Sequence, residues 1–533
     1  MLNMKNTSII ALIIAVFAAF GCSTDYLDTA PTGSTNPDLI FETTSGSAAA
    51  INGLGYLMHR QYGAYGQGYN GEGTIRLYMG EYLGNNLMKG NSTTFKNAAI
   101  GDQFVSNTAT LSSFAWYYYY MVIANANTLL NRIDDAEGPQ TDRDFIKAQA
   151  LSYRAYCYFN LVQLFGRRWS DGQDKPACVL RLTGKEPDNL DRSTVGEVYA
   201  QIYKDLNKAI ELYEASGKAN RRTSTHMMDL DVAYAIFARV ALTREDWDNA
   251  LKYAKLARKN YKLMSVTEEQ SGFCNPNGEW IWSLFGTDDE TLYYYDYFSY
   301  ASYNASSSTT RNYPLLISKH LFDQIPKTDI RRSFWLDPAN YKGKYSTSTN
   351  KASKQDTTNA LWVYGQEYAS QDGRVGITTA HCVFAYMNFK IHNNSQPGIG
   401  HLCLFRASEM LLIEAEALYN LGGREDEVRA LLVELNKTSG RDPAYTCTKT
   451  GVELMDEIKL YRGIELWGEG FNWFDLKRWG DSIDRKKASQ GGNWLSSYAG
   501  SFGKNEKNNW TWSIPRNETD YNKGITKITN TDD

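Results

Sequence analysis

Residues Arg462–Gly480 read RGIELWGEGFNWFDLKRWG and crowd acidic, basic and aromatic side chains into one short stretch. All of the stretch except Gly480 falls within 451–479, where apolar side chains recur at the spacing of a helix. In one continuous helix, Glu465 and Glu469 would share a face, because residues four positions apart are neighbours on a helix surface. The aromatic side chains around them suit tight packing. We therefore interpret the stretch as part of a packed helical scaffold.

The two carboxylates also admit a catalytic interpretation. Glycoside hydrolases use two Asp or Glu side chains as acid and base, and Glu465 and Glu469 could form such a pair. The packing interpretation is favoured, because Arg462 and Arg478 can offset both negative charges. The sequence contains no H-E-x-x-H, G-x-S-x-G or P-loop motif, and its six histidines lack metal-site spacing. We expect no catalytic residues, no metal site and no cofactor.

Helical spacing recurs through much of the chain. Thr141 and Thr194 each precede an acidic residue three positions later, which is the pattern of a capping box at a helix start. The predicted helices are 141–165, 194–213, 231–243, 246–260, 406–421, 425–436 and 451–479. Their pairing resembles degenerate tetratricopeptide repeats. The sequence therefore predicts a mostly α fold, an α/α superhelix with a tetratricopeptide-like scaffold of helix pairs and a loop-rich, irregular ligand-binding half.

Two regions lose the helical spacing. Gly, Ser, Asn, Thr and Tyr dominate residues 265–400, and a similar composition returns in 62–105. Such composition predicts long loops with short strands. Long loops inside a compact protein are usually functional, so we expect a binding site among them.

The overall composition limits the possible functions. Lys and Arg number 56 and Asp and Glu 60, so the formal net charge is −4, which argues against nucleic-acid binding. The hydrophobic fraction of 42% is enough for a large core and excludes wholesale disorder. The 37 tyrosines are unusual. Tyrosine suits surfaces that must be both apolar and hydrogen-bonding, which favours recognition.

The N-terminus indicates export. The apolar run 9–20 would span only about 18 Å as a helix, which is too short to cross a bilayer, so 1–21 is predicted as a signal peptide. Gly21-Cys22 then resembles a lipoprotein processing site, and we predict that Cys22 is acylated and followed by a polar tether. The alternative is an ordinary secretory signal with a chance cysteine. Six further cysteines permit disulfides, but their spacing assigns no partners.

The aromatic clusters of the loop-rich region are the first candidates for a binding site. Trp280 and Trp282 would share one side of a strand by period-two spacing, and Tyr293, Tyr295 and Tyr297 follow closely. Sugars present flat C–H faces that stack on such rings, so these five residues are predicted to contact a ligand. The alternative is that the rings pack the loops onto the scaffold.

Several stretches of the chain together resemble one family of bacterial proteins. They are Ala150–Gly166, Arg406–Ala417, Arg462–Gly480 and Ile514–Glu518 with Asn522. Their sequences and order are similar to those of SusD/RagB-like proteins, which are surface nutrient-binding lipoproteins of Bacteroidetes-type bacteria. With the lipoprotein signal, the resemblance covers essentially the whole mature chain.

The resemblance implies a function for the predicted fold. In this family a helical scaffold docks on a SusC-like, TonB-dependent outer-membrane transporter, and the lipoprotein delivers an oligosaccharide or polysaccharide without cleaving it. The expected regions are a signal peptide 1–21, an acylated Cys and tether 22–40, an N-terminal family region 41–264, a loop-rich ligand-binding region 265–400 and a C-terminal family region 401–533.

The first loop region supplies polar candidates for the same site. Arg76, Tyr78, Glu81, Asn85 and Asn86 offer the amide, acidic and basic groups that sugar hydroxyls require. The spacing of Glu81 from the two asparagines looks like the position where the family often carries an acidic or amide pair beside its glycan site.

Two other functions stay open. An exported tetratricopeptide-type adaptor would hold another protein with its helix pairs and would not need Trp280 or Trp282. A glycoside hydrolase would release products from a polysaccharide and would lose activity when one carboxylate is removed.

Overall fold

The structure is a computed structural model, and it describes residues 39–66, 68–90, 96–217, 224–286, 296–340, 362–364, 374, 376–378 and 381–526. The expected signal peptide, Cys22 and most of the tether lie outside these residues. So do the candidate site residues Tyr293 and Tyr295.

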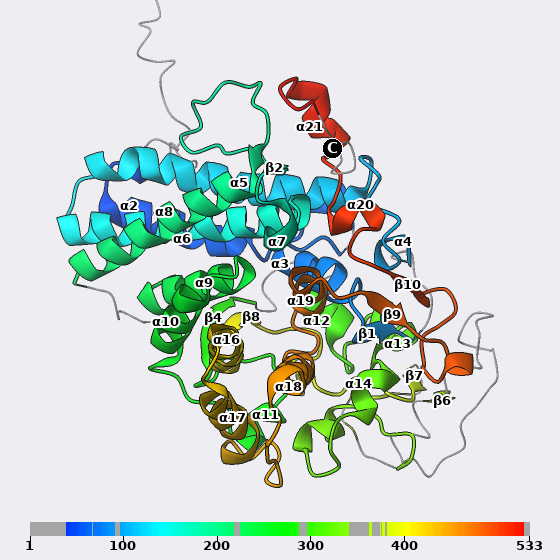
Figure 1. Ribbon diagram of the computed structural model, residues 1–533. Helices are drawn as coiled ribbons and strands as arrows, with labels where there is room; N and C mark the ends of the chain where they lie inside the picture. The colour runs from blue at the N-terminus through cyan, green and yellow to red at the C-terminus, as the bar shows by residue number, and fades with distance from the viewer. Residues whose placement is uncertain are drawn as a thin grey trace, which may run out of the picture.

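Long helices build most of the N-terminal half (Figure 1). They are α2 (Thr44–Leu57), α5 (Thr110–Arg132), α6 (Gln140–Phe165), α8 (Val195–Ala215), α9 (Leu230–Thr243) and α10 (Trp247–Arg258). α6 packs against both α5 and α8, and α9 packs against α10. This arrangement confirms the predicted mostly α fold.

A second group of helices follows near the C-terminus. It comprises α16 (Ala407–Leu421), α17 (Glu425–Val433) with a π-helical extension η7 (Glu434–Thr438), α18 (Gly451–Glu465) and α19 (Asn472–Trp479). α16 also packs against α10, which joins the two groups. The predicted single helix over 451–479 is wrong, because the chain leaves the helix after Glu465. Glu469 therefore does not share a helix with Glu465.

The two predicted capping boxes have different outcomes. At the start of α8, the Thr194 hydroxyl accepts from the Glu197 backbone N–H, and the Glu197 carboxylate accepts from the Thr194 backbone N–H, as predicted. α6 instead begins at Gln140 after Pro139, without a side-chain cap. Thr141 lies one residue inside this helix, so the capping box predicted there is wrong.

Short elements connect these helices. The short helical turns are η2 (Leu39–Phe41), η3 (Gly63–Tyr65), α3 (Glu72–Thr74), η4 (Ile75–Glu81), α4 (Lys96–Ala99), η5 (Ile133–Asp135), α7 (Trp169–Gly172), α11 (Val266–Glu269), α12 (Tyr297–Ala301), α13 (Ser308–Asn312), α14 (Lys319–Asp323), η6 (Ile330–Phe334), η8 (Ala488–Gln490), α20 (Lys507–Trp510) and α21 (Arg516–Tyr521). Of these, η4 is π-helical and packs against α19.

The strands form small antiparallel pairs rather than a central sheet. The pairs are β1 (Leu87–Lys89) with β5 (Leu315–Ile317), β2 (Pro176–Cys178) with β3 (Ser193–Thr194), β4 (Trp280–Leu284) with β8 (Leu402–Arg406), β6 (Trp362–Tyr364) with β7 (Cys382–Phe384), and β9 (Ile483–Arg485) with β10 (Gly500–Phe502). In the β4–β8 pair, Trp280 lies opposite Arg406 and Leu284 opposite Leu402.

A large hydrophobic core draws residues from Ile51 to Ile525, and a smaller cluster that includes Phe145, Leu212 and Leu230 lies between α6, α8 and α9. The C-terminal segment packs against helices of the N-terminal half in the large core. The Trp512 amide donates to the Leu164 carbonyl at the end of α6 at 2.9 Å. The six described cysteines are free, and Cys157 is buried in this core as a small apolar side chain.

The break between α18 and α19 is a tight glycine-dependent turn. Gly468 and Gly470 have φ values of 81° and 92°, which only glycine adopts without strain. η4 packs directly on this turn. A Cβ atom on Gly80 would lie 2.3 Å from the carbonyl oxygen of Gly470, so this position of η4 also requires glycine.

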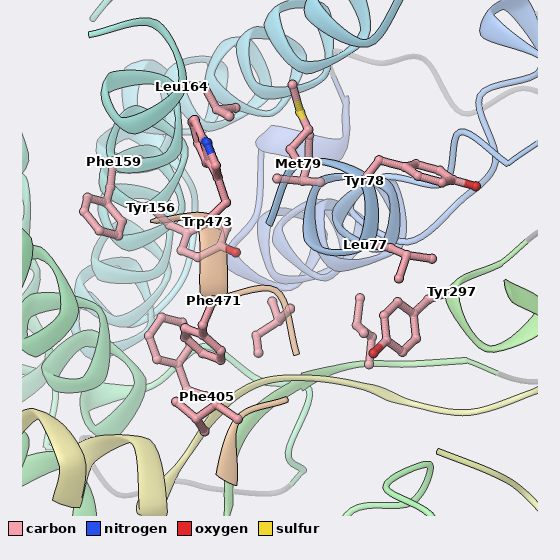
Figure 2. Close-up of a cluster of buried hydrophobic side chains, with 14 of the residues drawn as sticks. Leu77, Tyr78, Met79, Tyr156, Phe159, Leu164, Tyr297, Phe405, Phe471 and Trp473 are labelled. Atoms are coloured by element: carbon pink, nitrogen blue, oxygen red, sulfur yellow. The ribbon is translucent and has the colours of Figure 1, made fainter. Parts of the chain in front are cut away.

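Two side chains of η4 fasten the turn. The Glu81 carboxylate accepts the backbone N–H groups of Gly470 and Phe471 at 2.7 and 3.0 Å. The Arg76 guanidinium donates to the Glu469 carbonyl at 2.6 Å. Phe471 is thereby held in the core among the rings shown in Figure 2.

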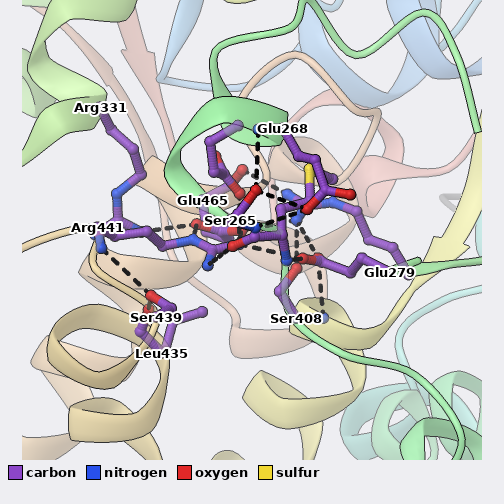
Figure 3. A network of polar contacts seen from close by, with 12 residues as sticks. Ser265, Glu268, Glu279, Arg331, Ser408, Leu435, Ser439, Arg441 and Glu465 are labelled. Carbon is purple, nitrogen blue, oxygen red and sulfur yellow. Dashed lines mark hydrogen bonds and ion pairs between the residues drawn. The ribbon is translucent and has the colours of Figure 1, made fainter. Parts of the chain in front are cut away.

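A buried network of charges holds the end of α18. The Glu465 carboxylate accepts from Arg331 and Arg406 at 2.7 Å each and from Arg441 at 3.0 Å (Figure 3). Burial alone would raise the pKa of Glu465, but Arg441, Arg406 and Arg331 hold it well below its ordinary value. Each arginine comes from a different part of the chain, so the carboxylate joins three segments.

Further carboxylates extend the network. Glu279 accepts from Arg406 at 2.7 Å and from Arg441 at 3.2 Å. Glu469 accepts from Arg406 at 2.8 Å and from the Lys390 ammonium at 2.7 Å. The extra hydrogen bonds satisfy donors that would otherwise be buried without partners.

We predict that Glu465→Gln lowers the free energy of unfolding by about 3–5 kcal/mol, because three buried guanidinium groups lose the negative charge that they share. Thermal or urea unfolding would measure the change. Glu427→Gln is the matched control, since Glu427 pairs with Arg424 at an exposed site. The control should leave the free energy of unfolding nearly unchanged, because an exposed ion pair contributes little. Equal effects of the two substitutions would contradict the importance of the network.

Candidate functional site

The structure places Trp280 and Trp282 in the core. Both side chains are 0% exposed, and residues on both faces of β4 are buried. The rings of Tyr156 and Phe405 pack against Trp282, with centroids at 5.4 and 6.2 Å. The prediction that these tryptophans offer open faces to a ligand is therefore wrong, because β4 has no solvent-facing side.

Two tyrosines of the predicted site are buried as well. Tyr297 starts α12, and its hydroxyl donates to the Gly468 carbonyl in the turn after α18. Tyr78 lies within η4, and burial raises the pKa of its phenol well above the ordinary value. Figure 2 shows both rings within the core. Neither ring is available for stacking on a ligand, so this part of the prediction is also wrong.

Arg76 and Glu81 serve the fold rather than an open site. Their polar groups bind the backbone of the turn described above, and the side chains are buried. Burial raises the pKa of Glu81 to about 7, although the N–H groups of Gly470 and Phe471 oppose the shift. The predicted contact of Arg76 and Glu81 with a saccharide is wrong, because both side chains are buried in the protein.

Asn85 and Asn86 are half-buried. The Asn85 side chain donates to the Ser482 carbonyl and accepts from the Asp484 amide. The Asn86 carbonyl accepts from the Trp467 indole N–H at 3.0 Å. Their role as ligand contacts stays a prediction, as does that of Tyr293 and Tyr295.

The two candidate catalytic carboxylates, Glu465 and Glu469, both form buried ion pairs. Glu465 faces three guanidinium groups, and Glu469 faces Arg406 and Lys390. Burial would raise the pKa of Glu469, but Arg406 and Lys390 lower it below the ordinary value. A general acid needs a raised pKa, so the pair is unsuited to glycoside hydrolysis. Among the described residues, no group of three or more His, Cys, Asp or Glu side chains could hold a metal ion.

An open hollow lies elsewhere, between α2 and the end of β4. Its volume is about 370 Å³. We call it the aromatic hollow, and its lining residues are Asn52, Gly55, Tyr56, Ser224, His226, Met227, Ser283, Leu284 and Phe285. Tyr56 and Phe285 are 53% and 48% exposed, so each offers a ring face to solvent. The aromatic hollow therefore combines accessible rings with a cavity of ligand size.

The fold explains why these two rings are exposed. Asn52 and Tyr56 are four residues apart on α2, so they share the face turned away from the buried Ile51 and Leu54. Phe285 directly follows the last residue of β4, where strand pairing ends. The side chains of Asn52 and Tyr56 form no hydrogen bond with other described residues, so an amide and a phenol are available to a ligand.

Histidines border the aromatic hollow. The rings of His226 and His401 stack with centroids 5.0 Å apart, and both lie close to Phe285, at 5.1 and 5.2 Å. His226 Nδ1 lies 3.1 Å from the Ser283 carbonyl oxygen. Burial and His226 lower the pKa of His401 to about 4. The His401 ring is therefore neutral at neutral pH and stacks on His226, which lines the aromatic hollow.

A second hollow adjoins the first along α2. Its volume is about 440 Å³, and its lining residues are Thr44, Ser45, Ala48, Ile51, Asn52, Asp142, Phe145, Ile146, Gln149 and Met227. Asn52 and Met227 line both hollows. The two hollows therefore lie next to each other beside α2 and share the side chains of Asn52 and Met227.

The sequence contains a weak signal for this site. Asn52 and Tyr56 have helical spacing, and Phe285 ends an apolar strand, but the lining comes from three segments far apart in the chain. Their proximity follows from the packing of α2 and β4 against α6. The structure alone reveals it.

Comparison with known proteins finds relatives that are similar over most of this chain. A family model described as "Starch-binding associating with outer membrane" matches residues 26–242. A relative from Formosa agariphila, SusD-like protein P2, is 24% identical over 490 residues, covering 88% of this chain and 89% of that protein. A SusD-like protein from Bacteroides ovatus is 26% identical over 250 residues, covering 45% of this chain and 40% of that protein.

Solved structures share the fold. A SusD-like carbohydrate binding protein from Bacteroides vulgatus has a TM-score of 0.71 at 23% identity, covering 91% of this chain and 97% of that one. A SusD superfamily protein from Bacteroides thetaiotaomicron has a TM-score of 0.68 at 21% identity, covering 91% and 99% of the two chains. No described helix has the length and apolar character needed to cross a membrane. The SusD family model matches residues 250–530, more than half of the sequence, and the chain therefore belongs to the SusD family.

Proposed function

We propose that this protein is a non-catalytic, carbohydrate-binding lipoprotein of the outer-membrane surface. It captures an oligosaccharide or polysaccharide and delivers it to a SusC-like, TonB-dependent transporter. The printed descriptions of a matching family and of a solved relative, starch-binding and carbohydrate binding, support the ligand class. The observation that carries the proposal is the pair of exposed rings, Tyr56 and Phe285, at a hollow of about 370 Å³.

The aromatic hollow has the chemistry that a sugar ring needs. A pyranose presents C–H groups on its faces, which stack on the rings of Tyr56 and Phe285. Its hydroxyl groups meet the amide of Asn52 and the phenol of Tyr56 at the same opening. A few stacking contacts of about 1 kcal/mol each, together with hydrogen bonds, suggest binding near −4 to −8 kcal/mol, which corresponds to a millimolar to micromolar Kd.

Non-catalytic binding is supported by the state of the carboxylates. Glu465 and Glu469 are enclosed in the charge network, and the lining of the aromatic hollow includes neither Asp nor Glu. Asp142 lines the second hollow, but no other carboxylate lines it. Glycoside hydrolysis needs two carboxylates across the scissile bond, so neither described hollow has that arrangement.

We predict that Tyr56→Ala and Phe285→Ala each weaken the affinity for the bound saccharide about 5- to 10-fold, because each removes a stacking contact of about 1 kcal/mol. Isothermal titration against a panel of oligosaccharides and polysaccharides would identify the ligand and measure the loss. Tyr521→Ala is the matched control, since Tyr521 is 85% exposed on α21, away from the hollow. Trp282→Ala should lower stability instead.

The titration, an assay for released sugars and a search for a protein partner together distinguish the alternative functions. Saccharide binding that survives both substitutions in the aromatic hollow would place the site elsewhere on the chain. Release of shorter sugars from a polysaccharide by the purified protein would identify a hydrolase. Failure to bind any saccharide, with capture of a protein partner, would identify an adaptor.

We predict that Cys22→Ser moves the protein from the membrane fraction to the soluble fraction, because acylation of this thiol supplies the anchor. Burial of lipid chains contributes about 0.8 kcal/mol per CH₂ group to the free energy of membrane binding. Without the chains, the protein should therefore no longer stay bound to the membrane. Fractionation of cells followed by detection of the protein would test this. A variant that stays membrane-bound would show that another feature provides the anchor.

A further inference from the structure

A small cavity lies beneath the turn between α18 and α19, away from both hollows. Its volume is about 40 Å³. We call it the arginine cavity, and its charged lining residues are Arg76, Arg239, Arg462, Arg478, Glu72 and Asp475. A space of this size exceeds what one water molecule needs and can hold one small ion or a few waters.

Three guanidinium groups of the arginine cavity gather around one ring. Those of Arg76, Arg239 and Arg462 lie 5.7, 5.0 and 5.3 Å from the centroid of Phe471. Figure 2 shows this ring in the core together with Tyr156 and Phe159, which also line the cavity. The face of a ring attracts each cation but does not neutralise it. Three positively charged groups therefore lie close together beside this ring.

The arginines differ in how they are neutralised. Arg239 pairs with Glu409 at 2.6 Å. Asp475 is shared, because its carboxylate accepts from Arg462 at 2.7 Å and from Arg478 at 2.9 Å. Arg478 has a further partner in Glu416, whereas Arg462 pairs only with the shared carboxylate among the described residues.

Arg76 has no carboxylate partner within ion-pair distance among the described residues. Its two terminal nitrogens donate to the backbone carbonyls of Glu469 and Leu404. The nearby Glu72 accepts instead from the phenols of Tyr118 and Tyr156. Burial raises the pKa of Glu72, although Arg76 opposes the shift, so this carboxylate compensates the arginine poorly.

Two buried N–H groups of the cavity lack an acceptor. They are Nε of Arg76 and Nη1 of Arg462. The two residues are only 6% and 2% exposed, and both line the arginine cavity. A buried donor on a charged group is rarely left without an acceptor in a folded protein. The geometry therefore calls for an occupant that accepts hydrogen bonds and carries negative charge.

We propose that the arginine cavity is a binding site for one small monovalent anion of the size of chloride. Arg76 Nε and Arg462 Nη1 are the donors, and the remaining guanidinium groups supply the surrounding positive potential. The volume excludes a saccharide, so the site is separate from the proposed carbohydrate function. The anion joins η4 to the end of α18, where Glu81 already fastens the turn.

Crystals of the unmodified protein grown or soaked in bromide test the site directly. The expected result is an anomalous bromide peak in the cavity within hydrogen-bond distance of both donors. A cavity that contains only water in bromide would overturn the proposal. This measurement needs no variant and does not depend on knowing the carbohydrate ligand.

Thermal unfolding provides the second test. A ligand that binds only the folded state stabilises it in a saturable way. The unmodified protein should therefore melt at a higher temperature in sodium chloride than in sodium gluconate of equal ionic strength, because gluconate is too large for the cavity. Arg462→Lys keeps the positive charge but removes Nη1. The difference in melting temperature between chloride and gluconate should be at least tenfold smaller in this variant.

Arg516→Lys is the matched control for general salt effects, because Arg516 is exposed on α21 and pairs with Asp520 at the surface. It should keep the full difference between chloride and gluconate. An equal difference in all three proteins would overturn the proposal. If Arg462→Lys does not fold, the bromide experiment on the unmodified protein still decides.

Discussion

One buried carboxylate determines how distant parts of this chain meet. Removing Glu465 from water is unfavourable unless its charge is fully paired, and three arginines from separate segments provide that pairing. Arg406 is the last residue of β8 and lies opposite Trp280. Holding Arg406 thus fixes one end of the β4–β8 pair, and Phe285 leaves β4 at the other end. One strand pair therefore connects the charge network to an accessible ring at the candidate site.

The aromatic residues divide between two tasks. Most of the rings, including Trp282, Tyr156 and Phe471, are buried where several helices converge. A minority, including Tyr56 and Phe285, remain exposed because a helix face or a strand end turns them outward. The high tyrosine content therefore does not measure the size of the binding surface. Buried phenols also serve as hydrogen-bond donors inside the core, as Tyr118 and Tyr156 do for Glu72.

Much of the fold could be predicted from the sequence, because regular periodicity reports helices well. The predicted segments 231–243 and 246–260 agree closely with α9 and α10. The break after Glu465 could not be predicted, since it depends on Gly470 packing under η4 from a distant part of the chain. The site residues were mostly misassigned for a related reason. Period-two spacing shows that Trp280 and Trp282 share a side of a strand, but not whether that side is covered.

The contact between Trp512 and Leu164 has a consequence for how the protein is made. The C-terminal segment covers part of the surface of α5 and α6, so these early helices cannot bury all of their apolar surface until synthesis is nearly finished. Contacts of such long sequence separation form slowly. The complete core therefore forms later than it would in a protein built from independent halves. Such a delay would suit the export proposed above, because an exported chain passes through a secretion channel before it acquires its final shape.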